Sequence, residues 1–266
     1  MGILRLGIGF FLQRLLCTLK QKMNMVKKLL LDILVRFDLY PQNKNLLGRT
    51  PWRQTKVRDF IFGARSFSQQ GEDLTLDRIL FLKLHLELET YKGLYVDAGA
   101  YHPISHSTTY LLYKRGWQGV CIDISEKSCR LIKKFRPRDI VVNAATSDVD
   151  GKLYFKQQPN ISLLHAASEQ AGSAGEDMID ALTLSTILQR QGIARQIDYL
   201  NIDTEGAELK TLQGLDFELY RPRVISVEIH EQNIPAALKT ELADFLHEKG
   251  YECVACNVIT YFFVRE

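Results

Sequence analysis

Three features that mark other classes of protein are missing from this sequence of 266 residues. Its five cysteines, an odd number scattered along the chain, form no disulfide framework and suit a reducing compartment. The longest uncharged stretch near the start, residues 6–13, is far shorter than the roughly 20 apolar residues that a membrane-spanning helix needs. No small-residue cleavage site closes an apolar core there, so we expect no signal peptide. Together these absences predict a cytoplasmic protein without a membrane-spanning segment.

The net positive charge of the sequence is concentrated in the first part of the chain. The formal net charge is +3, but residues 1–36 hold seven basic residues and one acidic residue, so the remainder carries −3. A nucleic-acid-binding protein would spread basic charge over its main face, and we therefore expect no nucleic-acid partner. Polar positions in residues 1–36 recur with a helical period, which predicts an amphipathic helical arm. The arm could pack on the protein or on a second subunit, or lie peripherally on the inner face of an anionic membrane.

A linker separates this arm from the rest of the chain. Residues 39–56 contain two prolines and many polar side chains, a composition that is typical of a linker. We therefore predict two parts, an arm with its linker over residues 1–60 and a folded domain over residues 61–266. The domain should open with a helix that starts near Ser68, because leucines and isoleucine then follow at helical spacing.

Strands and helices alternate from residue 94 onward. Apolar strands are expected at 94–99, 119–123, 139–145, 197–203, 224–230, 252–257 and 258–266, with helices such as 105–116 and 125–135 between them. This alternation predicts an α/β fold with a parallel sheet that helices cover on both faces. The last two strands are too close in sequence for a helical crossover, so they should form an antiparallel hairpin. The sequence thus predicts a seven-stranded, mainly parallel sheet with a C-terminal antiparallel hairpin.

Two further segments have competing interpretations. Residues 157–180 form a polar insertion rich in glycine, serine and alanine, which is either a surface loop or a mobile lid over a substrate. The pair Cys253-x-x-Cys256 resembles a metal or redox motif but lies in a predicted strand. Residues i and i+3 of a regular strand face opposite sides, so we expect these thiols to lie apart.

The expected strands end in polar or acidic residues, and the dinucleotide fingerprint G-x-G-x-x-G is absent after the first of them. Open parallel sheets bind ligands beyond the carboxyl ends of their strands. The residues collected there are Asp97, Gly99, Asp123, Asn143, Asp203, Glu205, Glu208, Glu228 and His230. We expect them to line one crevice.

S-adenosylmethionine is a ligand that matches this set. It has no pyrophosphate, and it needs one glycine, Gly99, where the backbone passes close to the ligand. Asp123, which follows Asp97 by 26 positions, could accept both ribose hydroxyls. The ammonium and sulfonium groups of this ligand are cationic, which suits acidic strand ends.

Several blocks of the sequence also resemble FkbM-type methyltransferases. "YVDAGAYHPISHSTTYLLYKRGWQGVCID" and "IDYLNIDTEGAELKTLQGLDFELYRPRVISVEIH" are similar to the family's cofactor motifs and to its central acidic block. "SQQGEDL" resembles an upstream Gln-x-x-Glu-Asp segment, so the match runs from about residue 66 to the C-terminus. The resemblance implies the class I methyltransferase (Rossmann-like) fold, S-adenosylmethionine as cofactor and O-methylation as the usual reaction. It assigns Asp97, Gly99 and Ala100 to the cofactor motif and Asp123 to the ribose. Thr204 departs from the valine that is common in the family.

The candidate site has catalytic and cofactor-binding members. A base should take the hydroxyl proton of the acceptor, and Asp203, His230 and Glu205 are the catalytic candidates. The expected cofactor contacts are Asp97, Gly99, Ala100, Asp123, Ile124, Asn143, Ala144 and Asp203. No metal is expected, although Asp203, Glu228 and His230 form an alternative carboxylate–histidine set for a divalent ion.

The leading interpretation is an S-adenosylmethionine-dependent O-methyltransferase that acts on a hydroxyl of a glycan, a lipid-linked sugar or a secondary metabolite. One alternative is a nicotinamide-dependent oxidoreductase, which the single glycine and the terminal hairpin disfavour. Another is a non-catalytic module that keeps the fold within a membrane-associated assembly, which the full set of acidic residues disfavours.

Overall fold

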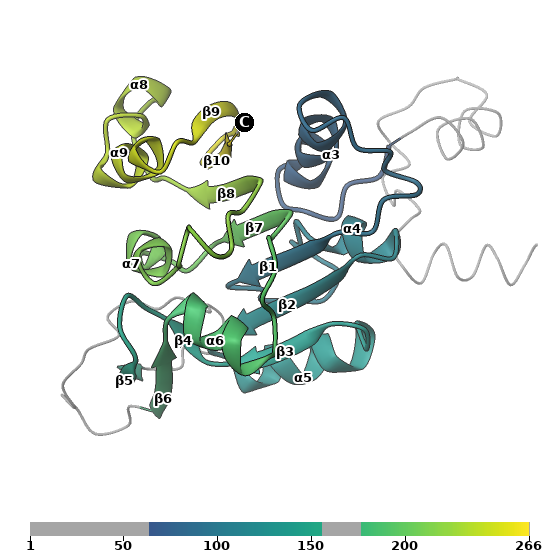
Figure 1. Ribbon diagram of the computed structural model, residues 1–266. Coiled ribbons are helices and arrows are strands. Elements are labelled where there is room, and N and C mark those ends of the chain that lie inside the picture. Colours follow the sequence, from purple (N-terminus) through teal and green to yellow (C-terminus); the bar gives the residue numbers. More distant parts are fainter. Residues whose placement is uncertain (1–63, 156–176, 266) are drawn as a thin grey trace, which may run out of the picture. The chain divides into compact units, whose positions relative to one another are not determined.

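The computed structural model describes residues 64–155 and 177–265, which Figure 1 draws in colour. The predicted arm and linker, residues 1–60, and residues 157–176 of the insertion lie outside this described part. No helix within the described ranges is long and apolar enough to cross a membrane. The expectations for the arm, for its contact with membranes and for a lid therefore stay predictions.

A seven-stranded sheet forms the centre of the described domain, with its strands in the order β3-β2-β1-β7-β8-β10-β9. These strands are β1 (Leu94–Ala98), β2 (Gln118–Asp123), β3 (Ile140–Asn143), β7 (Tyr199–Ile202), β8 (Val224–Glu228), β9 (Glu252–Asn257) and β10 (Thr260–Val264). Neighbouring strands from β3 to β8 pair in parallel, whereas β10 is antiparallel to both β8 and β9. The predicted mainly parallel sheet with a C-terminal hairpin is confirmed. The direction of strand addition reverses between β1 and β7, where open α/β sheets bind their ligands.

Helices cover both faces of the sheet because its strands present apolar side chains alternately to each side. In β1, Val96 packs into one core and Tyr95 into the other. The core around Val96 also contains residues of α6 (Leu184–Arg190), α7 (Glu208–Gln213), α8 (Ile234–Ala237) and α9 (Glu241–Glu248). The core around Tyr95 contains residues of α3 (Glu72–Leu82), α4 (Tyr110–Lys114) and α5 (Glu126–Phe135), as Figure 1 allows the eye to follow.

The first helix begins later than predicted, at Glu72 instead of near Ser68. The carboxylate of Asp73 accepts hydrogen bonds from the hydroxyls of Ser66 and Ser68 at 2.6 and 2.9 Å. It also accepts the backbone N–H of Phe67 at 2.7 Å. These bonds fold the chain before α3 into a loop, so the serine that was expected to start the helix belongs to that loop.

The helix predicted over 105–116 is limited to α4 because its first residues serve other bonds. His106 has a φ of 56°, in the left-handed region, and interrupts a right-handed helix there. The Ser107 hydroxyl accepts the backbone N–H of Tyr110 at 3.2 Å, and the Thr109 hydroxyl is used by buried partners. Residues 105–109 are therefore a shaped loop at the end of β1.

A second, three-stranded sheet was not predicted. The strand expected over 139–145 ends at Asn143, and β4 (Ala145–Thr146) pairs with β6 (Asp177–Leu182) instead. The strand β5 (Gly151–Phe155) is antiparallel to β6 and completes the order β4-β6-β5. Part of the expected insertion, residues 177–180, is thus strand. The signal was weak because these strands are short and only part of β5 and β6 is buried.

The two thiols of the Cys-x-x-Cys pair face the same side of β9, contrary to expectation. Cys253 and Cys256 pack against the core around Val96, whereas Val254 and Ala255 pack against the other core. The pairing register between β9 and β10 shifts by one residue at this point, which is a β-bulge. An extra residue in a strand reverses the alternation of its faces, and this explains the difference.

Candidate active site

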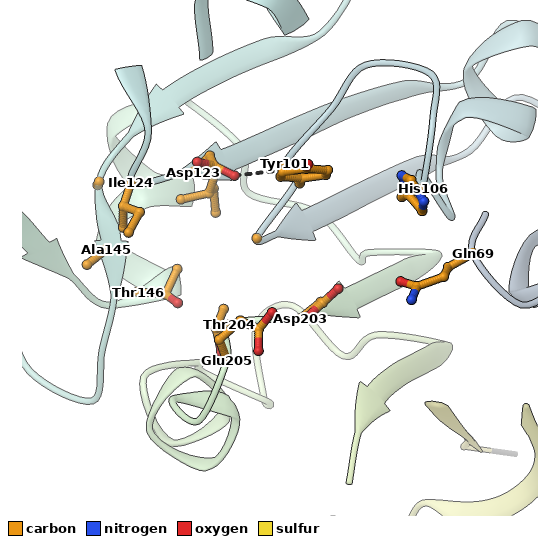
Figure 2. Close-up of a pocket in the computed structure, with 13 residues that line it drawn as sticks. Gln69, Tyr101, His106, Asp123, Ile124, Ala145, Thr146, Asp203, Thr204 and Glu205 are labelled. Atoms are coloured by element: carbon orange, nitrogen blue, oxygen red, sulfur yellow. Dashed lines mark hydrogen bonds between the residues drawn. The ribbon is translucent and has the colours of Figure 1, made fainter. Parts of the chain in front are cut away.

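A cavity of about 280 Å³ lies at the carboxyl ends of the central parallel strands. We call it the carboxyl-edge pocket. Residues that follow β1, β2, β3 and β7 converge on it, and Figure 2 shows their side chains around one hollow. Its lining consists of Gln69, Gly99, Tyr101, His106, Ile122, Asp123, Ile124, Ala144, Ala145, Thr146, Asp203, Thr204 and Glu205. The position agrees with the switch in strand order between β1 and β7.

The structure brings together only part of the set proposed from the sequence. The proposed residues that line the pocket are Gly99, Asp123, Ile124, Ala144, Asp203 and Glu205. The proposed residues that do not line it are Asp97, Ala100, Asn143, Glu208, Glu228 and His230. The first group forms part of the cavity wall, whereas most of the second group shapes the backbone around it.

Gly99 is required by a close contact within the chain itself. Its φ is +85°, and a methyl group added there would lie 1.7 Å from the backbone carbonyl oxygen of Asp203. The sequence had suggested that this glycine allows the backbone to approach a ligand. The structure places a neighbouring backbone there instead, so Gly99 joins the end of β1 to the end of β7 and also lines the pocket.

Asp123 ends β2 and is held by two backbone groups. Its Oδ2 accepts the N–H of Tyr101 at 2.7 Å and its Oδ1 accepts the N–H of Ser125 at 2.7 Å. Burial raises the pKa of Asp123 to about 6, although these two hydrogen bonds oppose the shift. The carboxylate is therefore ionised at neutral pH, and its remaining lone pairs are available to the hydroxyls of a ribose.

Asp203 follows β7 and is the most strongly perturbed acid of the pocket. Burial raises its pKa to about 8, and the negative charges of Glu228 and Glu205 add to the shift. Its backbone N–H donates to the carbonyl of Ala98 at 2.9 Å, which continues the pairing of β1 with β7. Asp203 can therefore hold or release a proton near neutral pH, as a general base must.

The loop after Asp203 is folded by Glu208. Its carboxylate accepts the N–H of Gly206 at 2.9 Å and that of Thr204 at 3.2 Å. Glu205 has a φ of 53°, and this left-handed turn places it on the wall of the pocket. Glu208 thus supports the loop, while Glu205 contributes negative charge to the pocket.

Asp97 lies beneath the pocket in a buried polar network. Its carboxylate accepts hydrogen bonds from the Thr109 hydroxyl and, at 2.9 Å, from the side-chain amide of Asn201. Burial raises its pKa, while the nearby guanidinium of Arg136 opposes the shift. Arg136 is itself fully buried and pairs with Asp139 at 2.7 Å. The network fixes the turn that follows β1, so Asp97 positions the pocket and does not line it.

Ala100 and Asn143 also act on the backbone of the pocket. The N–H of Ala100 donates to the carbonyl of Ile122 at 3.1 Å. The side-chain amide of Asn143 donates to the carbonyls of Asp123 and Ile124 at 2.9 and 2.8 Å. These bonds fix the backbone at the end of β2, where Asp123 and Ile124 line the pocket.

His230 stands away from the pocket. Its side chain is 63% exposed, and its Nε2 lies 3.3 Å from the carboxylate of Glu228. Within the described residues, no group of three or more histidine, cysteine, aspartate or glutamate side chains could hold a metal ion. The alternative set of Asp203, Glu228 and His230 is therefore not assembled as a cluster.

Sequence reasoning missed several lining residues, among them Gln69, Tyr101 and His106. A signal for Gln69 was present, because "SQQGEDL" carries Glu72 and Asp73, whose carboxylates fold the loop that bears it. Tyr101 and His106 have φ values of 47° and 56°, which only a structure reveals. Figure 2 shows His106 and Gln69 on the side of the pocket opposite Ile124.

The charge of the pocket agrees with the predicted cofactor. Among the residues that the structure describes, the lining contains Asp123, Asp203 and Glu205 but no lysine or arginine. Burial raises the pKa of Asp203, and the nearby negative charges of Glu228 and Glu205 raise it further. A ligand with an ammonium and a sulfonium group would supply positive charge, and ribose hydroxyls would meet Asp123.

Comparisons with known proteins agree with this geometry. The profile of the methyltransferase FkbM domain matches residues 97–253. The methyltransferase sdnD of Sordaria araneosa is 33% identical over 95 residues, which cover 32% of this chain and 35% of that relative. The match thus spans about a third of the relative's length.

Two solved structures are similar at low identity. A TehB-like SAM-dependent methyltransferase from Corynebacterium glutamicum has 11% identity and a TM-score of 0.37, with 81% of this chain and 96% of that chain covered. An O-methyltransferase from Bacillus cereus in complex with SAH has 12% identity and a TM-score of 0.34, with 86% and 97% covered.

Proposed function

Because the chain belongs to the FkbM methyltransferase family, we propose that it transfers a methyl group to a hydroxyl of a glycan, a lipid-linked sugar or a secondary metabolite. Family membership confirms the prediction from the sequence, and with the strand order it confirms the class I methyltransferase fold. The same match supports S-adenosylmethionine as the cofactor. When bound, this cofactor supplies an electrophilic methyl group on its sulfonium.

We assign the two sides of the carboxyl-edge pocket to different reactants. Asp123 and the neighbouring Ile124 form the side that receives the ribose and base of the cofactor. His106 and Gln69 lie on the other side, with Asp203 between the two (Figure 2). We therefore assign the acceptor to the His106 side, where the imidazole of His106 and the side-chain amide of Gln69 can form hydrogen bonds with a hydroxyl. The acidic lining disfavours acceptors that carry a carboxylate or a phosphate.

The observation that carries the proposal is the pKa of Asp203. A carboxylate with a pKa of about 8 accepts a proton far more readily than an ordinary aspartate, and it lies inside the pocket. Asp203, which lines the pocket, takes the hydroxyl proton as the acceptor oxygen attacks. Positive charge from the cofactor lowers its pKa again, so the ionised form is favoured when both reactants are bound.

The first test identifies the reaction. Extracts of cells with and without the protein are compared by mass spectrometry, and we expect a hydroxyl-bearing compound that gains one CH2 group. Isothermal titration should show binding of S-adenosylmethionine. Binding of NAD in its place would overturn the proposal.

The second test isolates Asp203. Asp203→Asn keeps the shape of the side chain and removes the base, so turnover should fall about 100-fold or more. Cofactor affinity should change far less. Asp177→Asn, an exposed residue outside the pocket, serves as the matched control and should keep full activity. If Asp203→Asn retains turnover within about threefold, Asp203 is not the base.

We also propose that residues 1–36 contact an anionic membrane surface. Their seven basic residues and helical period support this proposal. The full-length protein should float with anionic liposomes and release as salt rises. Lys27→Glu with Lys28→Glu should weaken flotation, and flotation that does not change would favour a packing role for the arm.

A further inference from the structure

A second cavity, of about 690 Å³, lies at the opposite edge of the same sheet. We call it the amino-edge pocket. Residues that precede β7, β8 and β9 line it, together with the end of β10 and the residues just after α3. Its lining consists of Lys83, Leu84, Gln196, Arg221, Pro222, Arg223, Gly250, Glu252, Val254, Val264 and Arg265. The proposed function uses none of these residues.

Positive charge dominates this lining. Four basic side chains, Lys83, Arg221, Arg223 and Arg265, face one acidic lining residue, Glu252, whose side chain is 82% exposed. Within the described residues, Lys83 and Arg265 form no ion pair. The guanidinium carbon of Arg265 lies 6.0 Å from the centre of the Tyr251 ring.

The two other arginines have acidic partners outside the lining. Arg221 pairs with Glu218 on the exposed surface at 2.7 Å, where ion pairs contribute little and exchange readily. Arg223 lies 3.4 Å from Asp198, which also accepts the hydroxyl of Tyr91 at 2.6 Å. A guanidinium group has five N–H donors, so each of these arginines keeps donors beyond those that its acidic partner uses.

The backbone that carries these arginines is fixed before any ligand arrives. The carbonyl of Pro222 accepts the buried hydroxyl of Tyr251 at 2.6 Å. The carbonyl of Arg223 accepts the N–H of Arg265 at 3.3 Å, and the carbonyl of Arg221 accepts the side-chain amide of Gln196 at 3.2 Å. A pocket with its backbone already ordered loses less entropy on binding than a flexible one.

The shape and chemistry of the pocket indicate the class of ligand. Guanidinium groups donate pairs of parallel hydrogen bonds that match the oxygens of phosphate, and an ammonium adds a point charge. Apolar surface from Leu84, Val254 and Val264 lies beside the basic groups and can cover an organic part. Cavities of about this volume hold ligands of nucleotide or drug size.

We propose that the amino-edge pocket binds a phosphate group carried by a small organic molecule or by a lipid headgroup. The site is distinct from the carboxyl-edge pocket, because the two lie at opposite ends of the parallel strands. The proposal stands independently of methyl transfer, since it uses other residues and other charges.

The test uses the full-length protein with inorganic pyrophosphate in isothermal titration. The pocket variant combines Lys83→Gln with Arg265→Gln, the two cations without an ion pair in the described residues. The control variant combines Lys127→Gln with Arg130→Gln, two exposed residues of α5. Both variants lose the same charge, so a difference between them reports the pocket. Loss of charge-assisted hydrogen bonds should weaken pyrophosphate binding in the pocket variant about tenfold or more.

Vesicles distinguish the two sources of phosphate. Co-sedimentation is measured with phosphatidylcholine vesicles that contain or lack phosphatidic acid. Selective loss of pyrophosphate binding in the pocket variant supports a soluble ligand, and selective loss of vesicle binding supports a lipid headgroup. Equal binding by the pocket and control variants in both assays would overturn the proposal. Titration with S-adenosylmethionine checks that each variant is folded, and its outcome is separate from the phosphate result.

Discussion

The carboxyl-edge and amino-edge pockets lie at the two ends of the same parallel strands and carry opposite charge. In the first, the charges belong to short acidic side chains, and burial raises the pKa of Asp123 and Asp203 to about 6 and about 8. In the second, the charges sit at the ends of long lysine and arginine side chains that remain in contact with water. Ligand binding to the acidic pocket should therefore depend on the shape of the ligand and on pH. The basic pocket should respond to the number of charges and to ionic strength.

The largest effect should come from Gly99→Ala. The added methyl group would overlap the Asp203 carbonyl oxygen, 1.7 Å away, and the φ of +85° adds strain. We expect unfolding in urea to show a loss of about 3 kcal/mol or more. Gly192→Ala is the control, because its φ is +68° but no atom lies within 4 Å of the added group. It should lose about 1 kcal/mol. Equal losses would show that the close contact does not matter.

A smaller effect is expected from Asp123→Ala, which should separate the two pockets. Removal of charged hydrogen bonds to the ribose should cost about 1.5–3 kcal/mol, or about 10- to 150-fold in cofactor affinity. Pyrophosphate affinity should not change, because Asp123 lies at the other edge of the sheet. Calorimetry with both ligands tests this directly. Unaltered affinity for S-adenosylmethionine would remove Asp123 from the cofactor contacts.

The pH dependence of stability tests the environment of Asp203. Its pKa is raised from 3.8 to about 8 in the folded protein. Between these values the folded chain keeps a proton that the unfolded chain has released, so stability falls as pH rises through this window. Asp203→Asn removes the titration. The variant should match the wild type near pH 4 and exceed its melting temperature by several degrees above about pH 8. A constant difference in melting temperature across pH would contradict the raised pKa.

The smallest effect is expected from His230→Ala. This side chain is 63% exposed and does not line the carboxyl-edge pocket. Surface substitutions usually change free energies by about 0.5 kcal/mol or less, so turnover should stay within about twofold. A large loss of turnover with unchanged cofactor affinity would support His230 as the catalytic base.

The arrangement and direction of the strands in the large sheet were the most predictable features of this fold. Apolar strands that alternate with helices predicted the parallel sheet, and the short spacing before Thr260 predicted the antiparallel end. The small sheet of β4, β5 and β6 was missed because exposed strands lack a continuous apolar signal. The prediction that Cys253 and Cys256 face opposite sides of the strand was wrong because a β-bulge leaves no clear mark in a sequence.

The residues of the pocket were predictable where they lie at the end of a strand or directly after it. Asp123, Asp203 and Gly99 lie in the pocket because the ends of parallel strands meet at one edge. Asp97 ends its strand too, but its side chain is turned into a buried network by Thr109 and Asn201. The direction of a side chain at a strand end depends on partners distant in sequence, and these become visible only in three dimensions.

The contact between Gly99 and the Asp203 carbonyl also limits how this domain can be recombined with relatives. A chimera that takes its β1 turn from one parent and its β7 turn from another joins two backbones that must interlock within van der Waals range. Exchanges of sequence should succeed when both turns come from one parent. Loops such as 101–109 can then be taken from the other parent. In laboratory evolution, the range of acceptors should therefore change most easily through the loop that bears Tyr101 and His106, while the two interlocking turns are inherited together.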